Sequence, residues 1–207
     1  MKAIPLAAAC AFVLAGAALA APADRPGHES PQPGSKSETM SAVKDTTAGL
    51  VGTVSAEMTT TTKGFVNAAA ISDMYEVTAG KIALERAQSP DVKAFAQKMV
   101  DAHTMTTQKL KSIIASNNIN VTPPAHVDRR RQAMLDDLRG AKAQDFDHRY
   151  ISQQIAAHKE ADILFRGYAK DGDNAAIKDF AAATDKDIKM HLSMAQQLDA
   201  STKTANR

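Results

Sequence analysis

The stretch QKMVDAHTMTTQKL, residues 97–110, contains the pattern that decides the fold. Met99, Thr106 and Leu110 recur at the three- and four-residue spacing of a buried helix face, which predicts a long amphipathic helix. One titratable side chain, His103, lies in the middle of this face. A buried imidazole without a partner destabilises the fold, so we expect His103 to form a hydrogen bond or to bind a metal.

The same period continues from about residue 64 to residue 200 and predicts four long helices. Ser89 and Pro90 are a typical N-cap and first helical residue, and Asp173 is the expected N-cap of the last helix. No strand pattern interrupts the helices. We therefore predict an all-α fold, a four-helix bundle with a short extra helix in the connection between the second and third long helices. The expected helices are residues 64–88, 90–117, 128–139, 145–170 and 173–200.

Composition divides the chain into four parts. Residues 1–20 combine Lys2, an apolar run and the small residues ALA, which predicts a signal peptide cleaved after Ala20 and a protein of the periplasm or cell envelope. Residues 21–62, rich in Pro, Ser, Thr and Gly, are expected to form a disordered or weakly helical tether. The bundle follows at residues 63–200, and residues 201–207 form a tail. The mature chain contains no segment that predicts a transmembrane helix.

The only cysteine, Cys10, lies in the expected signal peptide. An alternative interpretation takes LAAAC, residues 6–10, as a lipobox, in which case Cys10 would carry a lipid. Without it the mature chain has no thiol and no disulfide. Removing Lys2 from the 25 basic residues leaves one more basic than acidic residue, which argues against a nucleic-acid-binding protein. The basic run at residues 129–131 is interpreted as a solvated helix face.

Each long helix carries a titratable residue inside its apolar face, namely Glu76, His103, His158 and His191. Glu76 and His103 are equally distant from the turn between Ser89 and Pro90, so an antiparallel hairpin places them level. His158 and His191 are nearly symmetric about the next turn. The long connection before the third helix leaves its direction open, but in either direction all four residues fall in one middle layer.

Three imidazoles and one carboxylate form a reasonable site for Zn, Cu or Fe, and Asp73, Asp147 and Asp187 are candidates for hydrogen bonds that orient these ligands. Met99 or Met194 beside the histidines would favour Cu(I). Asp147 is equally explained by the dipole of its helix, and Asp187 by an ion pair one turn away. The alternative to a metal is a buried hydrogen-bond network that fixes the register of the helices.

Three segments resemble a family of bacterial exported proteins, the domain of unknown function 4142. They are FVNAAAISDMYEVTAGKIALERAQSPDVKAFAQKMVDAHT (65–104), FDHRYISQQIAAH (146–158) and KMHLSMAQQL (189–198). The resemblance implies a helical bundle similar to those of ferritin-like proteins. It does not indicate a particular activity. The family pattern maps onto Glu76, His103, Phe146, Asp147, Tyr150, His158 and His191. In the family an Asp usually precedes the second-helix histidine, whereas this chain has Ala102 there and Asp101 one place earlier.

Three functions remain open at the level of sequence. The first is an exported module that binds a transition metal through the central layer. The second is a structural or partner-binding envelope protein whose layer holds no metal, with the partner unknown. The third is an oxidoreductase, but the Glu-x-x-His pairs of di-iron bundles are missing, because Val100, Ile155 and Ile188 stand three residues before the histidines. No Ser/His/Asp, phosphate-loop or dinucleotide motif offers another enzyme.

Overall fold

A computed structural model describes residues 54–205 of the chain. Within this range the structure is all-α, as predicted, and contains no strand. The expected signal peptide, Cys10 and residues 21–53 of the expected tether lie outside the described residues. No helix in the described range is long and apolar enough to cross a membrane. The helices are α3 (Ala56–Thr60), α4 (Thr62–Arg86), α5 (Pro90–Ser116), α6 (Arg129–Gly140), α7 (Ala143–Asp171) and α8 (Ala175–Ala205).

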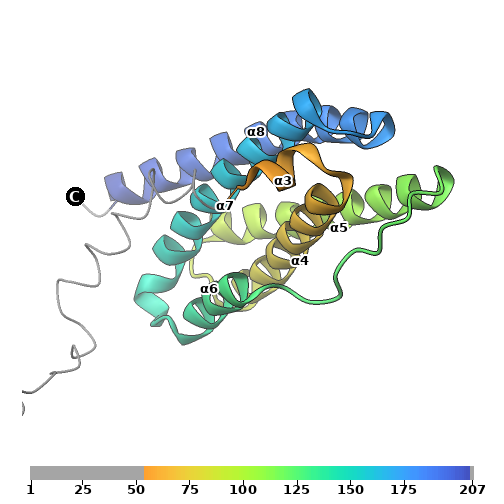
Figure 1. Ribbon diagram of the computed structural model, residues 1–207. Coiled ribbons are helices and arrows are strands. Elements are labelled where there is room, and N and C mark those ends of the chain that lie inside the picture. The colour runs from red at the N-terminus through yellow and green to blue at the C-terminus, as the bar shows by residue number, and fades with distance from the viewer. Residues whose placement is uncertain (1–53, 206–207) are drawn as a thin grey trace, which may run out of the picture. The chain divides into compact units, whose positions relative to one another are not determined.

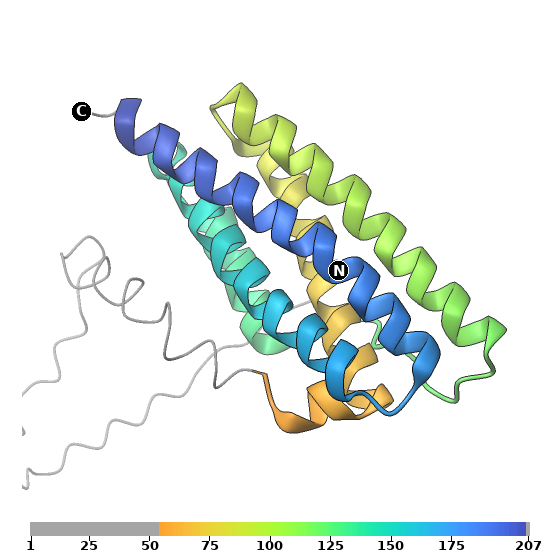
Figure 2. The same cartoon turned by 90° about the horizontal axis from the view of Figure 1, so that it is seen from above.

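The four long helices form two antiparallel hairpins, α4 with α5 and α7 with α8 (Figures 1 and 2). Asp147, near the start of α7, binds the turn between α4 and α5, whereas Ile113 and Ile114 at the end of α5 pack at the other end of the bundle. The connection through α6 therefore runs back along the bundle, and α7 is parallel to α5. One long crossover between two hairpins is compatible with ferritin-like connectivity.

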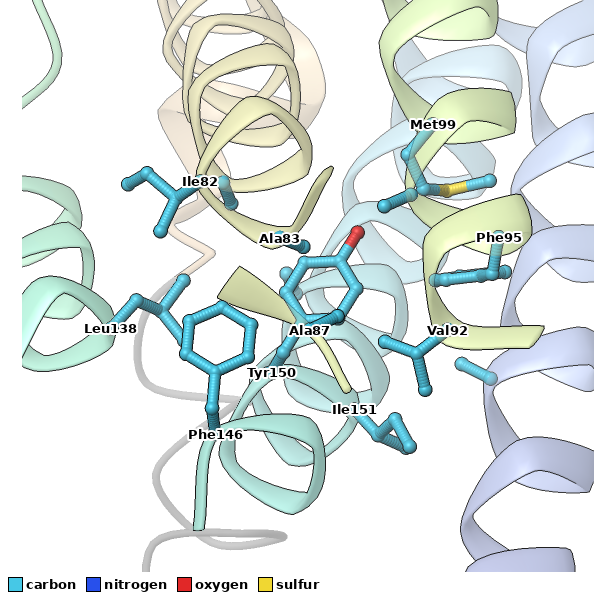
Figure 3. Packing of buried hydrophobic residues seen from close by; sticks show 14 of the residues in the cluster. Ile82, Ala83, Ala87, Val92, Phe95, Met99, Leu138, Phe146, Tyr150 and Ile151 are labelled. Atoms are coloured by element: carbon cyan, nitrogen blue, oxygen red, sulfur yellow. The ribbon is translucent and has the colours of Figure 1, made fainter. Parts of the chain in front are cut away.

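Two hydrophobic clusters fill the bundle, one on each side of the polar layer. The first contains Tyr75, Phe95, Phe146 and Tyr150 together with small residues of α4 such as Ala83 (Figure 3). The second is built around the rings of Phe65, Phe165, Tyr168 and Phe180. The many alanines let the helices approach, but the largest fully buried side chains are aromatic. Each such ring contributes roughly 1.5–3 kcal/mol by burial.

The expected tether ends earlier than the composition indicated. Val54 and Met58 pack against the second cluster, and α3 contacts both α4 and α7. Gly167 permits this approach, because a Cβ there would lie 2.6 Å from Thr59 Cγ2. The side chains of Val54 and Met58 thus hold α3, which lies in a Thr-rich segment, against the bundle. Residues 54–62 therefore belong to the bundle.

The N-cap of α8 is Asn174 rather than Asp173. Asn174 Oδ1 accepts from the backbone N–H of Ile177 at 3.1 Å. Asp173 Oδ1 instead accepts from the backbone N–H of Thr62 at 2.8 Å and from the Tyr168 hydroxyl at 2.9 Å. Asp173 therefore ties the start of α4 to the turn between α7 and α8.

The basic run in α6 is not uniformly solvated, contrary to the sequence interpretation. Arg130 is exposed, but Arg131 is buried. The Arg131 guanidinium lies 3.2 Å from Glu160 Oε1 and 5.0 Å from the centre of the Tyr75 ring. This long side chain covers the first cluster with its stem while its charge is paired, so it fixes α6 against α4 and α7.

Candidate metal centre

Three histidine rings from three helices meet between the two hydrophobic clusters. His103 comes from α5, His158 from α7 and His191 from α8, and their relative exposures are 7%, 1% and 4%. The ring centroids are 5.6, 5.8 and 5.6 Å apart, which is nearly an equilateral triangle. The apolar periodicity of each helix turns these side chains inward, as predicted.

One ring nitrogen from each histidine lies within 4.8 Å of the other two. His103 Nε2, His158 Nε2 and His191 Nδ1 are buried and have no hydrogen-bond partner among the described residues. Buried polar atoms are nearly always satisfied, so three unsatisfied nitrogens at one place require an explanation. Converging lone pairs on imidazole rings are the arrangement that a transition metal uses.

The outer nitrogen of His103 is held by a carboxylate of α4. His103 Nδ1 lies 2.8 Å from Asp73 Oδ1, and the second oxygen of Asp73 accepts from the Thr107 hydroxyl at 3.0 Å. In neutral His103, donation from Nδ1–H to Asp73 leaves the lone pair on Nε2. Metal-binding histidines usually have this carboxylate support, and Asp73 was one of the residues expected to supply it.

His158 is held by the backbone of its own helix. Its Nδ1 is 2.9 Å from the carbonyl oxygen of Gln154, one turn earlier, and donation to that oxygen again leaves Nε2 free. Carboxylate and backbone carbonyl are both common supports of metal-binding histidines. Sequence reasoning gave no role to Thr107 or to Gln154, although each is four residues from a histidine on the same helix face.

The structure does not bring Glu76 into the group of converging atoms, although it lies in the same layer. Glu76 Oε2 accepts from Gln154 Nε2 at 2.7 Å, and Oε1 is 3.8 Å from Nδ1 of His158, the nitrogen that lies at the Gln154 carbonyl. The predicted fourth ligand is therefore a neighbour that positions Gln154 and His158. The candidate ligand set is three histidines.

Asp147 and Asp187, also expected beside the metal ligands, form no hydrogen bond to the three histidines among the described residues. Asp187 is exposed on α8 at the rim of a cavity. Asp147 accepts from the backbone N–H of Gln88 at 3.0 Å and of Ser89 at 2.8 Å, so it closes the turn between α4 and α5. Asp101 on the surface of α5 accepts from Gln97. The carboxylate beside His103 thus comes from α4 and not from its own helix.

Replacing Asp147 by Ala is expected to lower the free energy of unfolding by about 1–2 kcal/mol, because two backbone donors lose their acceptor. The metal affinity should not change, since Asp147 does not contact the histidines. Thermal unfolding and metal titration of the same sample check both statements. Asp147→Asn is the control, because its amide oxygen can still accept. A loss of metal affinity in Asp147→Ala would contradict this assignment.

The three histidine rings are all buried, but their pKa values differ because their hydrogen-bond partners and charged neighbours differ. Burial lowers the pKa of His158 to about 3, helped by the charge on His103. Burial lowers the pKa of His191 to about 3 as well, together with the charges on His158 and His103. For His103, burial is outweighed by the hydrogen bond to Asp73 and the charge of Glu76, and its pKa is raised. At neutral pH His158 and His191 are therefore neutral, the form that binds metal.

The geometry and charge of the site fit a transition metal. Tetrahedral Zn–N bonds of about 2.0–2.1 Å place the nitrogens ~3.4 Å apart, so the rings need to approach by at most about 1.4 Å. Burial raises the pKa of both Asp73 and Glu76, which marks a layer whose negative charge a cation would offset. Three imidazoles suit Zn or Cu and also accept Fe, and no carboxylate in the group favours Mg or Mn.

A cavity opens the site on one side. It lies between α5 and α8, has a volume of about 740 Å³ and is lined by both His103 and His191. Its outer edge carries Lys98 and Lys109 of α5 and Asp187 of α8. An ion can therefore reach the histidines from solvent without unfolding the bundle, and a small molecule could occupy a fourth coordination position.

Comparison with known proteins agrees with the resemblance seen in the sequence. The sequence model of one family, described as domain of unknown function (DUF4142), matches residues 51–198. Comparisons with curated proteins and with solved structures found no significant match. The matched range covers α3 to α8 as far as Leu198 and includes all three histidines. The chain belongs to the DUF4142 family.

Proposed function

We propose that this protein is an exported bundle that binds one transition-metal ion, Zn, Cu or Fe, through His103, His158 and His191. One observation carries the proposal: a nitrogen from each of three buried rings lies within 4.8 Å of the others, and each ring has a nitrogen without a partner among residues 54–205. A purely structural network would satisfy these atoms, because unsatisfied buried groups cost about 1–3 kcal/mol each.

The surrounding hydrogen bonds support ligand binding more than helix register alone. Asp73 and the Gln154 carbonyl hold the outer nitrogens of two rings, which leaves the inner nitrogens with lone pairs. A network whose only role was to fix the register would instead link the rings to each other. The cavity between α5 and α8 supplies an entry path.

The place of action is proposed from the sequence. Residues 1–20 have the pattern of a signal peptide. We therefore place the mature protein in the periplasm or cell envelope, where it would hold or buffer the ion. An enzymatic role is not part of the proposal, because the layer lacks the carboxylate set of redox bundles.

Metal titration of the untagged protein tests the proposal. Equilibrium dialysis against Zn²⁺ followed by elemental analysis should give one ion per chain. His103→Ala, His158→Ala and His191→Ala should each lose most of this binding while remaining helical. His148→Ala is the matched control, because His148 is exposed on the same helix as His158. The proposal fails if Zn²⁺, Cu⁺ and Fe²⁺ all stay unbound, or if the three variants bind like the parent.

A further inference from the structure

Two methionines lie at the cavity that leads to the histidines. Met105 of α5 has a relative exposure of 66% and Met190 of α8 one of 48%, and they are the exposed large hydrophobic side chains of the described residues. Both line the same cavity as His103 and His191. The two methionines that the sequence suggested, Met99 and Met194, do not line it, and both pack with the first hydrophobic cluster.

Met105 and Met190 lie at nearly the same height along the bundle. Helices α5 and α8 are antiparallel, and His103 and His191 are level, with ring centroids 5.8 Å apart. Met105 follows His103 by two residues and Met190 precedes His191 by one. With a rise of about 1.5 Å per residue, both methionines are displaced toward the same end, and their heights differ by only ~1.5 Å.

The two methionines line one cavity from the neighbouring helices α5 and α8. Packed helices are about 8–10 Å apart, a distance that two long, unbranched methionine side chains can span. Met105 shares a stripe of α5 with Lys98 and Lys109, and Met190 shares a stripe of α8 with Asp187. Because both side chains are largely exposed, they contribute little to the core and are accessible to an ion in solvent.

The sulfur atoms of the two methionines would bind some metal ions better than others. Thioether sulfur is a soft donor that prefers Cu(I) and binds Zn²⁺ or Fe²⁺ poorly. Three imidazole nitrogens also accept Cu(I), and the converging group contains no carboxylate to favour a harder ion. The two thioethers and two of the three imidazoles, those of His103 and His191, thus line one cavity through which an ion would reach the site.

We propose that the ion is copper in its Cu(I) state and that Met105 and Met190 are its entry ligands, which receive Cu(I) at the cavity mouth and transfer it to His103 and His191. The inference rests on the proposed function and makes the choice of ion specific. No electron is transferred in this process, because the copper enters and remains as Cu(I).

The test compares transfer of Cu(I) and binding of Zn²⁺ in matched variants. Untagged protein is mixed without oxygen with the Cu(I) complex of bathocuproine disulfonate, and the loss of the coloured complex is followed by stopped flow. The double variant Met105→Leu/Met190→Leu should take up Cu(I) about tenfold more slowly than the parent, because the soft donors are lost while the volume is kept. Met58→Leu, which alters a methionine in α3, should behave like the parent.

Zn²⁺ binding by the double variant should be unchanged. Methionine methyl NMR gives a second measurement: Cu(I) should shift two resonances that are missing from the double variant, and Zn²⁺ should not shift them. The inference is overturned if the double variant takes up Cu(I) as fast as the parent, or if the double variant also loses Zn²⁺ binding. In either case the histidine site stands, as long as the parent binds Zn²⁺. If the parent binds neither ion, both the proposed function and this inference are wrong.

Discussion

Zn²⁺ or Cu⁺ at a hundredfold excess over its dissociation constant is expected to raise the free energy of unfolding by about 2.7 kcal/mol. In Asp73→Asn the same concentration should add only about 0.4–1.4 kcal/mol, because loss of a supporting carboxylate typically weakens metal affinity 10–100-fold. The reason lies in the 2.8 Å contact of Asp73 Oδ1 with His103 Nδ1, which orients the ring and makes its other nitrogen more basic. Chemical denaturation with and without metal measures both gains.

Asp187→Asn is the control for this comparison. Asp187 is exposed at the cavity rim and does not hold any of the three rings, so its removal changes local charge without changing ring support. Its variant should keep the full gain of the parent. Equal gains in Asp73→Asn and in the parent would show that Asp73 does not act through the metal site.

Acidification of the metal-free protein from pH 6.5 to pH 5 is expected to lower the free energy of unfolding, with His158 contributing about 2 kcal/mol of the loss. The unfolded chain protonates this ring near pH 6.5, whereas in the folded state burial holds its pKa at about 3. Between these values only the unfolded state binds the proton, so stability falls with pH. His191 acts in the same direction, because its folded-state pKa is also lowered to about 3.

The other titratable residues of the layer affect how the free energy of unfolding changes at lower pH. The raised pKa of His103 keeps it protonated in both states below pH 6, so it adds no slope there. Asp73 and Glu76 have raised pKa values and take up protons first in the folded state, which opposes the loss as the pH falls further. His158→Gln should reduce the loss between pH 6.5 and 5, and His148→Gln should not. Identical slopes in the parent and in His158→Gln would contradict the buried, neutral state of this ring.

Helical periodicity was sufficient to predict the four long helices and the meeting of three histidines. Each histidine lies on an apolar stripe, and equal distances from a turn make two positions level in any antiparallel hairpin. Height along the axis does not determine the direction of a side chain around it, however. Glu76 is level with the histidines but its carboxylate accepts a hydrogen bond from Gln154. That difference removed it from the ligand set.

Contacts between segments distant in the sequence could not be predicted. The role of Asp147 depends on the direction of α7, which the long connection left open, and only the parallel arrangement of α5 and α7 brings it to the turn at Ser89. Arg131 is buried because Glu160 and Tyr75 meet it from two other helices. The packing of α3 rests on two apolar side chains in a polar segment, too few to produce a periodic signal.

X-ray absorption spectroscopy of the untagged protein loaded with one equivalent of metal tests the central claim most directly. The account predicts about three nitrogen neighbours near 2.0 Å with the outer-shell scattering of imidazole rings. The His158→Ala spectrum should lose one imidazole, whereas that of His148→Ala should match the parent. A parent spectrum without imidazole scattering, or one that is unchanged in His158→Ala, would show that the three buried histidines do not bind the ion.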